Sequence, residues 1–238
     1  MGDHITSNRK KTEDNYSSLP DDIISHILSF TNGDASFAVR TSILSKQWRY
    51  FWLTLDIFQI YYSHSGTKPE IYMKSFVNFA NRVSINVREL TVSCHVVKAL
   101  CDSLSVPSFP NLTRLTVLHY GGAAASYLPA FLSLTPNLKF IKISKQGSRK
   151  RMISKLELKH GKNIARCLES SLAVAEIEGL DVAGGMMEMV EYFLKYGKFL
   201  NSVAVIGYDF GVAKELLRFS RASPTCEVVV TGPERFYL

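Results

Sequence analysis

Cysteine and histidine are the side chains of this sequence that could bind a metal or act as nucleophiles, and they are scattered. The cysteines are Cys94, Cys101, Cys167 and Cys226. They form no C-x-x-C pair, and the six histidines add no second pair at metal-ligand spacing. No glycine-rich phosphate loop occurs, and Asp21 and Asp22 are neighbours that suit a helix start. We therefore expect a protein that is not an enzyme, with no catalytic residue, metal or cofactor.

The amino-terminal residues carry no targeting pattern. Residues 1–16 are polar and lack the apolar segment of a signal peptide, and we expect them to be a disordered tail. The chain has no run of about 18 apolar residues, so no membrane partner is expected. Cysteines without a secretory signal are typical of reduced, mostly buried thiols. These features predict an intracellular protein of the nucleus, the cytoplasm or both.

Positive charge is concentrated in one segment. Residues 1–60 carry six basic and seven acidic side chains, whereas the rest carries 22 basic and 14 acidic ones. The candidate patch for an acidic or phosphate-bearing partner is Lys145, Arg149, Lys150, Arg151 and Lys155. No aromatic residue interleaves this run, so nucleic acid would find no stacking platform there. A solvated loop is the alternative interpretation of the same charges.

The elements that could position a binding surface begin near the amino terminus. Pro20 suits the first turn of a helix, with Ser18 as its N-cap and Asp21 near the positive end of the helix dipole. Apolar residues follow at helical spacing in two groups: Ile23, Ile24, Ile27 and Leu28, then Leu44, Trp48 and Trp52. Short helices in about 40 residues have too little interior to bury these side chains. The pattern predicts a docking module that shares its core with a partner.

Beyond residue 85, a six-residue pattern recurs, with apolar residues at its first, fourth and sixth positions. Copies begin at Val87, Leu112, Leu138, Ile153, Leu172 and Leu200, and a weaker copy begins at Thr225. Each copy alternates like a short strand. Helical stretches are expected between copies, at Val97–Leu104, Tyr127–Leu134, Met186–Tyr196 and Val212–Phe219.

A strand and a helix in about 20–29 residues is the spacing of leucine-rich repeats, whose units stack because none can bury its own apolar face. The expected fold is therefore α/β, a short solenoid with parallel strands and flanking helices. A further helix over Ile71–Ala80 would cover the first strand. A generic α/β layer with the same content of strands and helices remains the alternative.

The amino-terminal segment resembles a plant F-box, the motif by which substrate receptors dock on the Skp adaptor of SCF-type ubiquitin ligases. The matching residues are Leu19–Asp22, His26–Phe30 and Ala38–Tyr50. The resemblance implies three helices with one side toward the adaptor. The residues expected to face the adaptor are Leu19, Pro20, Ile23, Ile27, Leu28, Val39, Leu44, Trp48 and Trp52.

The carboxy-terminal third resembles a second element, the FBD domain of plant F-box/FBD/LRR-repeat proteins. The resemblance lies in Cys167–Leu172, Glu176–Gly179, Val190–Lys195 and Glu215–Val228. Together the two resemblances imply an F-box at residues 17–60, then a linker helix with degenerate repeats at 61–166. An FBD domain at 167–238 would continue the repeat stack.

These resemblances imply a substrate-recognition subunit of an SCF-type E3 ubiquitin ligase. Its partners would be a Skp-type adaptor, through it a cullin, and an unknown protein substrate held by the repeat and FBD region. One alternative is a repeat scaffold without adaptor docking, because Thr31–Phe37 is longer and more polar than the usual F-box linker. A nucleic-acid-binding protein that uses the basic patch is the second alternative.

Overall fold

The structure is a computed structural model, and it describes residues 19–30, 34, 37, 40–41, 44, 48–60, 77–103, 107–118, 126–145, 164–180, 186–207, 215–216 and 218–231. The chain divides into two compact units, Met1–Leu55 and Asp56–Leu238. We call them the amino-terminal unit and the repeat unit, and we describe each by itself.

The amino-terminal unit contains helix α1 (Asp21–Ser29), helix α3 (Trp48–Phe51) and the 3-10 turn η2 (Trp52–Thr54). Its described core is small and consists of Ile24, Leu28 and Trp48, with the partly buried Leu19, Phe51 and Leu55 packed around it. The buried residues of α1 are one helical turn apart, so they form the stripe that faces α3.

Helix α1 begins at Asp21, two residues later than an N-cap at Ser18 would place it. Pro20 precedes the helix as its N-cap residue, and its carbonyl accepts the N–H groups of Ile23 and Ile24 at 3.0 and 3.2 Å. Asp21 and Asp22 lie in the first turn, as predicted, where the helix dipole favours negative charge. Ser18, the expected N-cap, lies outside the described residues.

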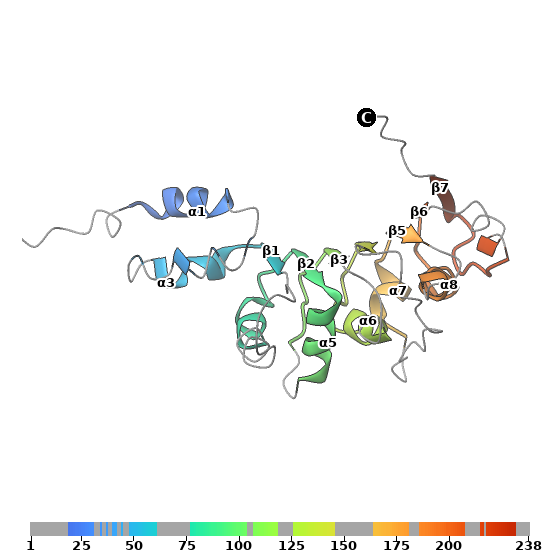
Figure 1. The fold of residues 1–238 in the computed structure, drawn as a ribbon, viewed down its shortest axis with the longest axis horizontal. Helices are drawn as coiled ribbons and strands as arrows, with labels where there is room; N and C mark the ends of the chain where they lie inside the picture. Colours follow the sequence, from blue (N-terminus) through green and yellow to red (C-terminus); the bar gives the residue numbers. More distant parts are fainter. Residues whose placement is uncertain are drawn as a thin grey trace, which may run out of the picture. The chain divides into compact units, whose positions relative to one another are not determined.

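The repeat unit is built on one sheet of seven strands, whose order in space is their order in the sequence (Figure 1). The strands are β1 (Ile57–Ile60), β2 (Glu89–Ser93), β3 (Arg114–Leu118), β4 (Phe140–Ser144), β5 (Val174–Leu180), β6 (Ser202–Gly207) and β7 (Glu227–Thr231). Every neighbouring pair is parallel. This arrangement confirms the predicted parallel-stranded α/β stack.

The helices of the repeat unit lie along one side of the sheet (Figure 1). They are α5 (Cys94–Asp102), α6 (Leu128–Leu132), α7 (Arg166–Ser170) and α8 (Met186–Tyr196). Helix α8 has the predicted bounds, α5 begins three residues before its prediction, and α6 is shorter. Helix α7 was not predicted, and half of the predicted helix at Val212–Phe219 lies outside the described residues.

The recurring apolar pattern explains how the strands pack. In the five clear copies that the structure describes, all three apolar positions are buried, and the strand begins two residues after the first of them. These first positions are Val87, Leu112, Leu138, Leu172 and Leu200. The copy at Ile153 lies outside the described residues, and the copy at Thr225 forms β7.

Strand β1 is a further repeat that the sequence analysis missed. Leu55-Asp-Ile-Phe58-Gln-Ile60 has the same apolar spacing, and β1 begins two residues after Leu55, as in the other copies. Phe58 is buried, and its ring lies 5.4 Å from that of Phe79 in an edge-to-face contact. Phe79 belongs to a helical segment at residues 77–83, which corresponds to the end of the helix predicted at Ile71–Ala80.

Hydrogen bonds at the start of each strand fix the stacking of the repeats. The carbonyl that precedes a strand accepts two backbone N–H groups from the next repeat; these carbonyls belong to Asp56, Arg88, Thr113, Lys139 and Ala173. Two asparagine side chains add to this ladder: Asn111 Nδ2 donates to the Ile85 carbonyl at 2.6 Å, and Asn137 Nδ2 donates to the Pro110 carbonyl at 2.8 Å. The turns between repeats therefore have partners for these polar groups.

Candidate docking and recognition surfaces

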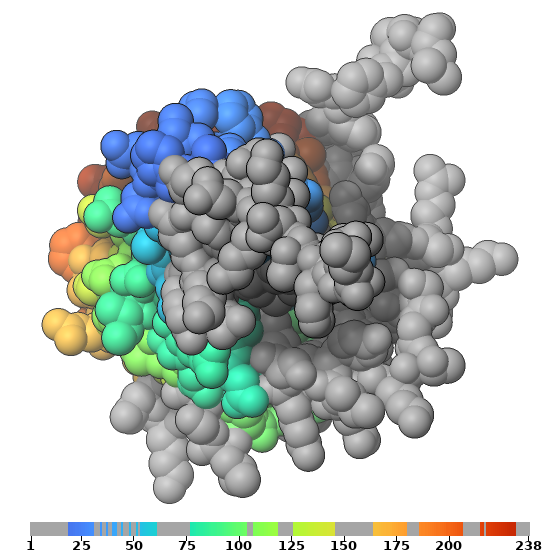
Figure 2. Space-filling view, turned by 90° about the vertical axis from the view of Figure 1, so that its left-hand side faces the viewer, coloured from blue at the N-terminus to red at the C-terminus, as the bar shows by residue number. Residues whose placement is uncertain are grey.

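The outer side of α1 carries apolar residues that the unit does not bury. Ile24 and Leu28 face the core, whereas Ile23 is 45% and Ile27 38% exposed. Figure 2 shows α1 at the surface, in blue. Ile23 and Ile27 are one turn apart and therefore share a flank of the helix. This flank is an apolar strip beside a core in which the described buried apolar residues are Ile24, Leu28 and Trp48.

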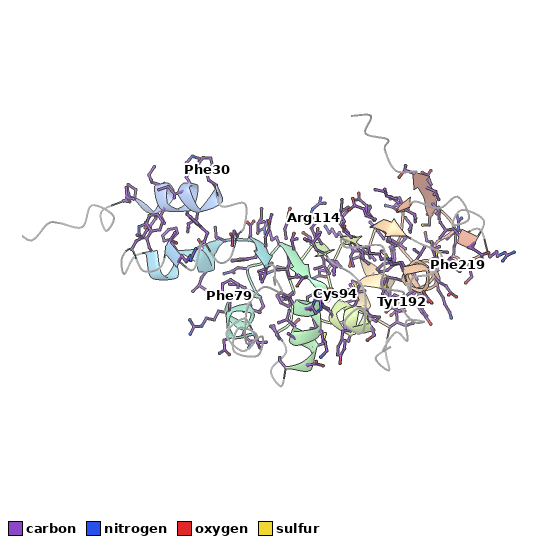
Figure 3. All side chains as sticks on the ribbon, in the orientation of Figure 1. Phe30, Phe79, Cys94, Arg114, Tyr192 and Phe219 are labelled. Carbon is purple, nitrogen blue, oxygen red and sulfur yellow. The ribbon has the colours of Figure 1, made fainter. Side chains whose placement is uncertain are left out.

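Two further aromatic side chains in the amino-terminal unit are exposed. Phe30, labelled in Figure 3, follows the end of α1 and is 71% exposed, with its ring 4.7 Å from the ring of His26. Phe37 is also exposed. Both were absent from the expected adaptor-facing set, although Phe30 is part of the F-box-like segment.

The expected adaptor-facing residues fall into three groups. Pro20, Ile23, Ile27 and Leu44 are exposed, and Leu19 is half-buried against the core. Leu28 and Trp48 are instead buried in the unit's own core, because the stripe of α1 that contains Leu28 packs on α3. Val39 lies outside the described residues, as does the side chain of Trp52. The structure thus separates residues that support the helices from residues available at the surface.

The repeat unit has an open sheet face on the side away from its helices. In each inner strand, buried residues alternate with residues that point to this face. Figure 3 shows Arg114 on this side and Cys94 on the helical side. Arg114 lies 3.7 Å from Glu89 of β2, and its guanidinium lies 4.3 Å from the ring centroid of Phe140 in β4.

A second charged cluster lies on β4 and β5. Lys142 Nζ is 2.5 Å from an oxygen of Glu178 and 3.8 Å from one of Glu176. All three side chains are about one-third exposed, so solvent screens these ion pairs only in part. Sequence reasoning missed both clusters because their members are 25 or more residues apart and meet only across strands.

The basic patch predicted from the sequence begins at the end of β4. Lys145 is half-buried, and its N–H donates to the Glu178 carbonyl at 3.1 Å. The next residue of β5, Gly179, has φ +77, and a Cβ there would lie 3.2 Å from the Lys145 carbonyl. Glycine is therefore favoured at this irregularity of β5. The other patch residues, Arg149, Lys150, Arg151 and Lys155, lie outside the described residues.

The thiols are placed for packing. Cys94, Cys167 and Cys226 are buried, as predicted, and Cys101 is half-buried. Burial raises the pKa of Cys101 to about 12 and that of Cys167 to about 11. These thiols stay protonated at neutral pH and are weak nucleophiles. Among the described residues, no group of three His, Cys, Asp or Glu side chains could hold a metal ion.

None of the described helices is both long and apolar enough to cross a membrane.

Comparison with known proteins identifies a domain in the amino-terminal segment. The family model of the F-box domain matches residues 16–60, a range that includes the described residues of the amino-terminal unit and β1. No solved structure matches this chain.

Several curated proteins of Arabidopsis thaliana are similar to this chain. A putative F-box/FBD/LRR-repeat protein is 32% identical over 155 residues, which are 61% of this chain and 34% of that protein. A second F-box/FBD/LRR-repeat protein is 28% identical over 160 residues, 63% of this chain and 34% of its own length. F-box/LRR-repeat protein 25 is 46% identical over 134 residues, 56% of this chain and 51% of its own length.

The chain thus spans about a third of the length of the F-box/FBD/LRR-repeat relatives. The matched domain agrees with the helices and the exposed apolar strip of the amino-terminal unit, and the repeat names agree with the parallel stack. This chain therefore carries a match to the F-box domain at residues 16–60 and is similar to F-box/FBD/LRR-repeat proteins of Arabidopsis thaliana over about 60% of its length.

Proposed function

We propose that this chain is a non-catalytic substrate-recognition subunit of an SCF-type ubiquitin ligase. Its F-box domain would dock on a Skp-type adaptor, which connects it to a cullin, and its repeat unit would hold a protein substrate. Such a receptor acts by proximity, because it raises the effective concentration of the substrate near the conjugating enzyme. The F-box match and the names of the relatives support this proposal.

The observation that carries the proposal is the exposed strip of Ile23 and Ile27 on α1. Exposed apolar residues that cluster on one side of a small unit mark a protein interaction site. The described core of the unit has only three buried apolar residues, so a partner that covers the strip would enlarge it. The adaptor-facing surface we propose contains Pro20, Ile23, Ile27, Phe30 and Leu44.

The open face of the sheet supports the second part of the proposal. Repeat stacks use their extended strand surfaces to bind partners. Here that surface presents Arg114 with Glu89, and Lys142 with Glu178, at fixed positions on neighbouring strands. We propose this face as the substrate surface, with the charged pairs giving specificity rather than most of the affinity.

Co-purification with a Skp-type adaptor tests the docking. The double variant Ile23→Asp, Ile27→Asp should lower the captured adaptor at least about tenfold, because charge would replace apolar anchors in the interface. The matched control is Ser25→Asp, Ser29→Asp, which adds the same charges on the opposite flank of the buried stripe. Circular dichroism of both variants verifies that the helices are retained.

The outcomes separate the alternatives. Capture by the wild type and the control, with loss in the Ile23 and Ile27 variant, supports adaptor docking. Equal capture by both double variants would place the adaptor on another surface. A wild-type chain that captures no adaptor would overturn the ligase function and favour a repeat scaffold. Nucleic-acid binding would instead show a steep decrease with salt.

A further inference from the structure

The last strand of the sheet has an open edge. Figure 1 shows β7 at the end of the sheet, where it pairs with β6 on one side. In the part of the chain that the structure describes, no strand pairs with its other side. Its Val229 is 46% and its Val230 40% exposed, on opposite faces of the sheet, whereas Val203 and Val205 of β6 are buried. An exposed apolar edge is a template for another strand.

The backbone direction of β7 identifies the groups at this edge. The N–H of Glu227 donates to the Asn201 carbonyl at 2.9 Å, so the backbone groups of Glu227 point toward β6. Backbone groups alternate along a strand, and those of Val229 and Thr231 therefore also point toward β6. The N–H and C=O groups of Val228 and Val230 point to the open edge, where an added strand would find them.

We propose that a second copy of this chain pairs with this edge, antiparallel, around a two-fold axis at Val229. In that register Val229 lies opposite its own copy as a non-hydrogen-bonded pair. Val228 lies opposite Val230 of the other copy, and each such pair exchanges both backbone hydrogen bonds. The symmetric arrangement closes after two copies, as isologous contacts do.

The side chains of β7 favour a second copy as the occupant. Glu227 is the charged residue of β7, and in this register it lies opposite Thr231 of the partner rather than opposite another carboxylate. Val230 lies on the same face of the sheet as the buried Val205, and its exposed side chain would be covered by Val228 of the other copy. The net charge of +7 opposes association of two copies, so the dimer should become tighter as salt screens this repulsion. A contact of two short strands is at the weak end of protein interfaces.

Disulfide formation in the full chain tests the register. The non-hydrogen-bonded pair places the two Val229 Cα atoms about 4.5 Å apart, which is within disulfide range. Val229→Cys should therefore form a covalent dimer under mild oxidation. Thr231→Cys should not link to itself, because its copy lies about 13 Å away along the strand. A mixture of Glu227→Cys and Thr231→Cys chains should give the mixed dimer, and the wild-type chain measures the background of the native cysteines.

Sedimentation equilibrium with lysine variants tests the association itself. Val229→Lys places two ammonium groups opposite each other and should weaken the dimer at least about tenfold. Thr231→Lys adds the same charge to the same strand but lies opposite Glu227, so it should leave the dimer intact or tighten it. Circular dichroism identifies any variant that fails to fold.

Three outcomes would overturn the proposal: a wild-type chain that stays monomeric at high concentration and salt, equal cross-linking of Val229→Cys and Thr231→Cys, or equal weakening by the two lysine variants. A further strand from a longer chain, or a different partner on this edge, would give the first of these results. Adaptor capture is read separately with the α1 variants, so failure of one proposal leaves the other in place.

Discussion

The two units bury their apolar residues to different extents. In the described part of the amino-terminal unit, the buried apolar residues are Ile24, Leu28 and Trp48, and the exposed large ones are Ile23, Ile27, Phe30, Phe37 and Leu44. In the repeat unit, each clear copy of the pattern adds three buried positions, because its neighbours cover both sides. The comparison teaches that stacking completes a core that a small unit leaves incomplete by itself.

The same contrast occurs between the two ends of the sheet. At β1, the ring of Phe79 covers Phe58. At β7, the equivalent residue is Val228, which is only half-buried, and the next residue on the same face, Val230, is exposed. An end that is covered by its own chain needs no partner, and an open end favours one. The predictions below compare covered with uncovered positions.

The largest effect is expected in the core of the repeat unit. Phe193 of α8 is fully buried, and Phe193→Ala should lower the free energy of unfolding by about 3–5 kcal/mol. Phe199→Ala is the matched control, because Phe199 is exposed and its loss should change stability by less than about 0.5 kcal/mol. Urea denaturation followed by circular dichroism measures both. Similar losses for the two variants would contradict the burial described here.

Neighbouring residues of α1 should separate stability from binding. Leu28→Ala removes a core side chain and should destabilise the amino-terminal unit by about 2 kcal/mol or more. Ile27→Ala should change its stability by less than about 0.5 kcal/mol but weaken adaptor capture about tenfold. Thermal unfolding and adaptor titration on the same samples measure the two effects. The comparison fails if Ile27→Ala unfolds the unit as strongly as Leu28→Ala.

A pH effect should follow from the buried thiol of Cys167. Burial raises its pKa from 9.0 to about 11, so the folded state resists ionisation that the unfolded state allows. The contribution of this pKa shift to the free energy of unfolding is fully present below pH 9. It should be lost, by up to about 2–3 kcal/mol, as the pH rises from 9 through 11. Denaturation at a series of pH values measures this slope. Cys167→Ala should be less stable at neutral pH and show a shallower slope; an unchanged slope would assign it to other groups.

The smallest effect is expected for one side chain of the ladder between repeats. Asn137→Ala removes the hydrogen bond to the Pro110 carbonyl and should cost about 1 kcal/mol of unfolding free energy. Lys139→Ala, at an exposed side chain nearby, is the control and should be close to neutral. Denaturation measures both. An equal effect of the two variants would show that the asparagine bond adds nothing to the stacking.

Much of the fold could be predicted from local spacing. The apolar pattern at Leu112, Leu115 and Val117 recurs in other copies, and a unit that cannot bury this face must stack. Leu55, Phe58 and Ile60 match the same pattern, but the copies expected from the sequence begin only at Val87, because the stretch that separates the copy at Leu55 from the copy at Val87 is longer than that between most later copies. The sequence did not predict which residues of the expected adaptor-facing set are exposed, since helical spacing does not tell which flank of a stripe meets the core.

The sequence by itself determined strands β2 to β7, their parallel order and the F-box-like segment, because these follow from the apolar spacing within each copy and from its regular recurrence. Only the tertiary structure decided that Ile24 is buried and Ile23 exposed, since the position of Trp48 selects the buried side of α1. It also decided the pairing of Lys142 with Glu178. Such contacts join residues far apart in sequence, and their distances are set by the stacking of whole repeats rather than by local pattern.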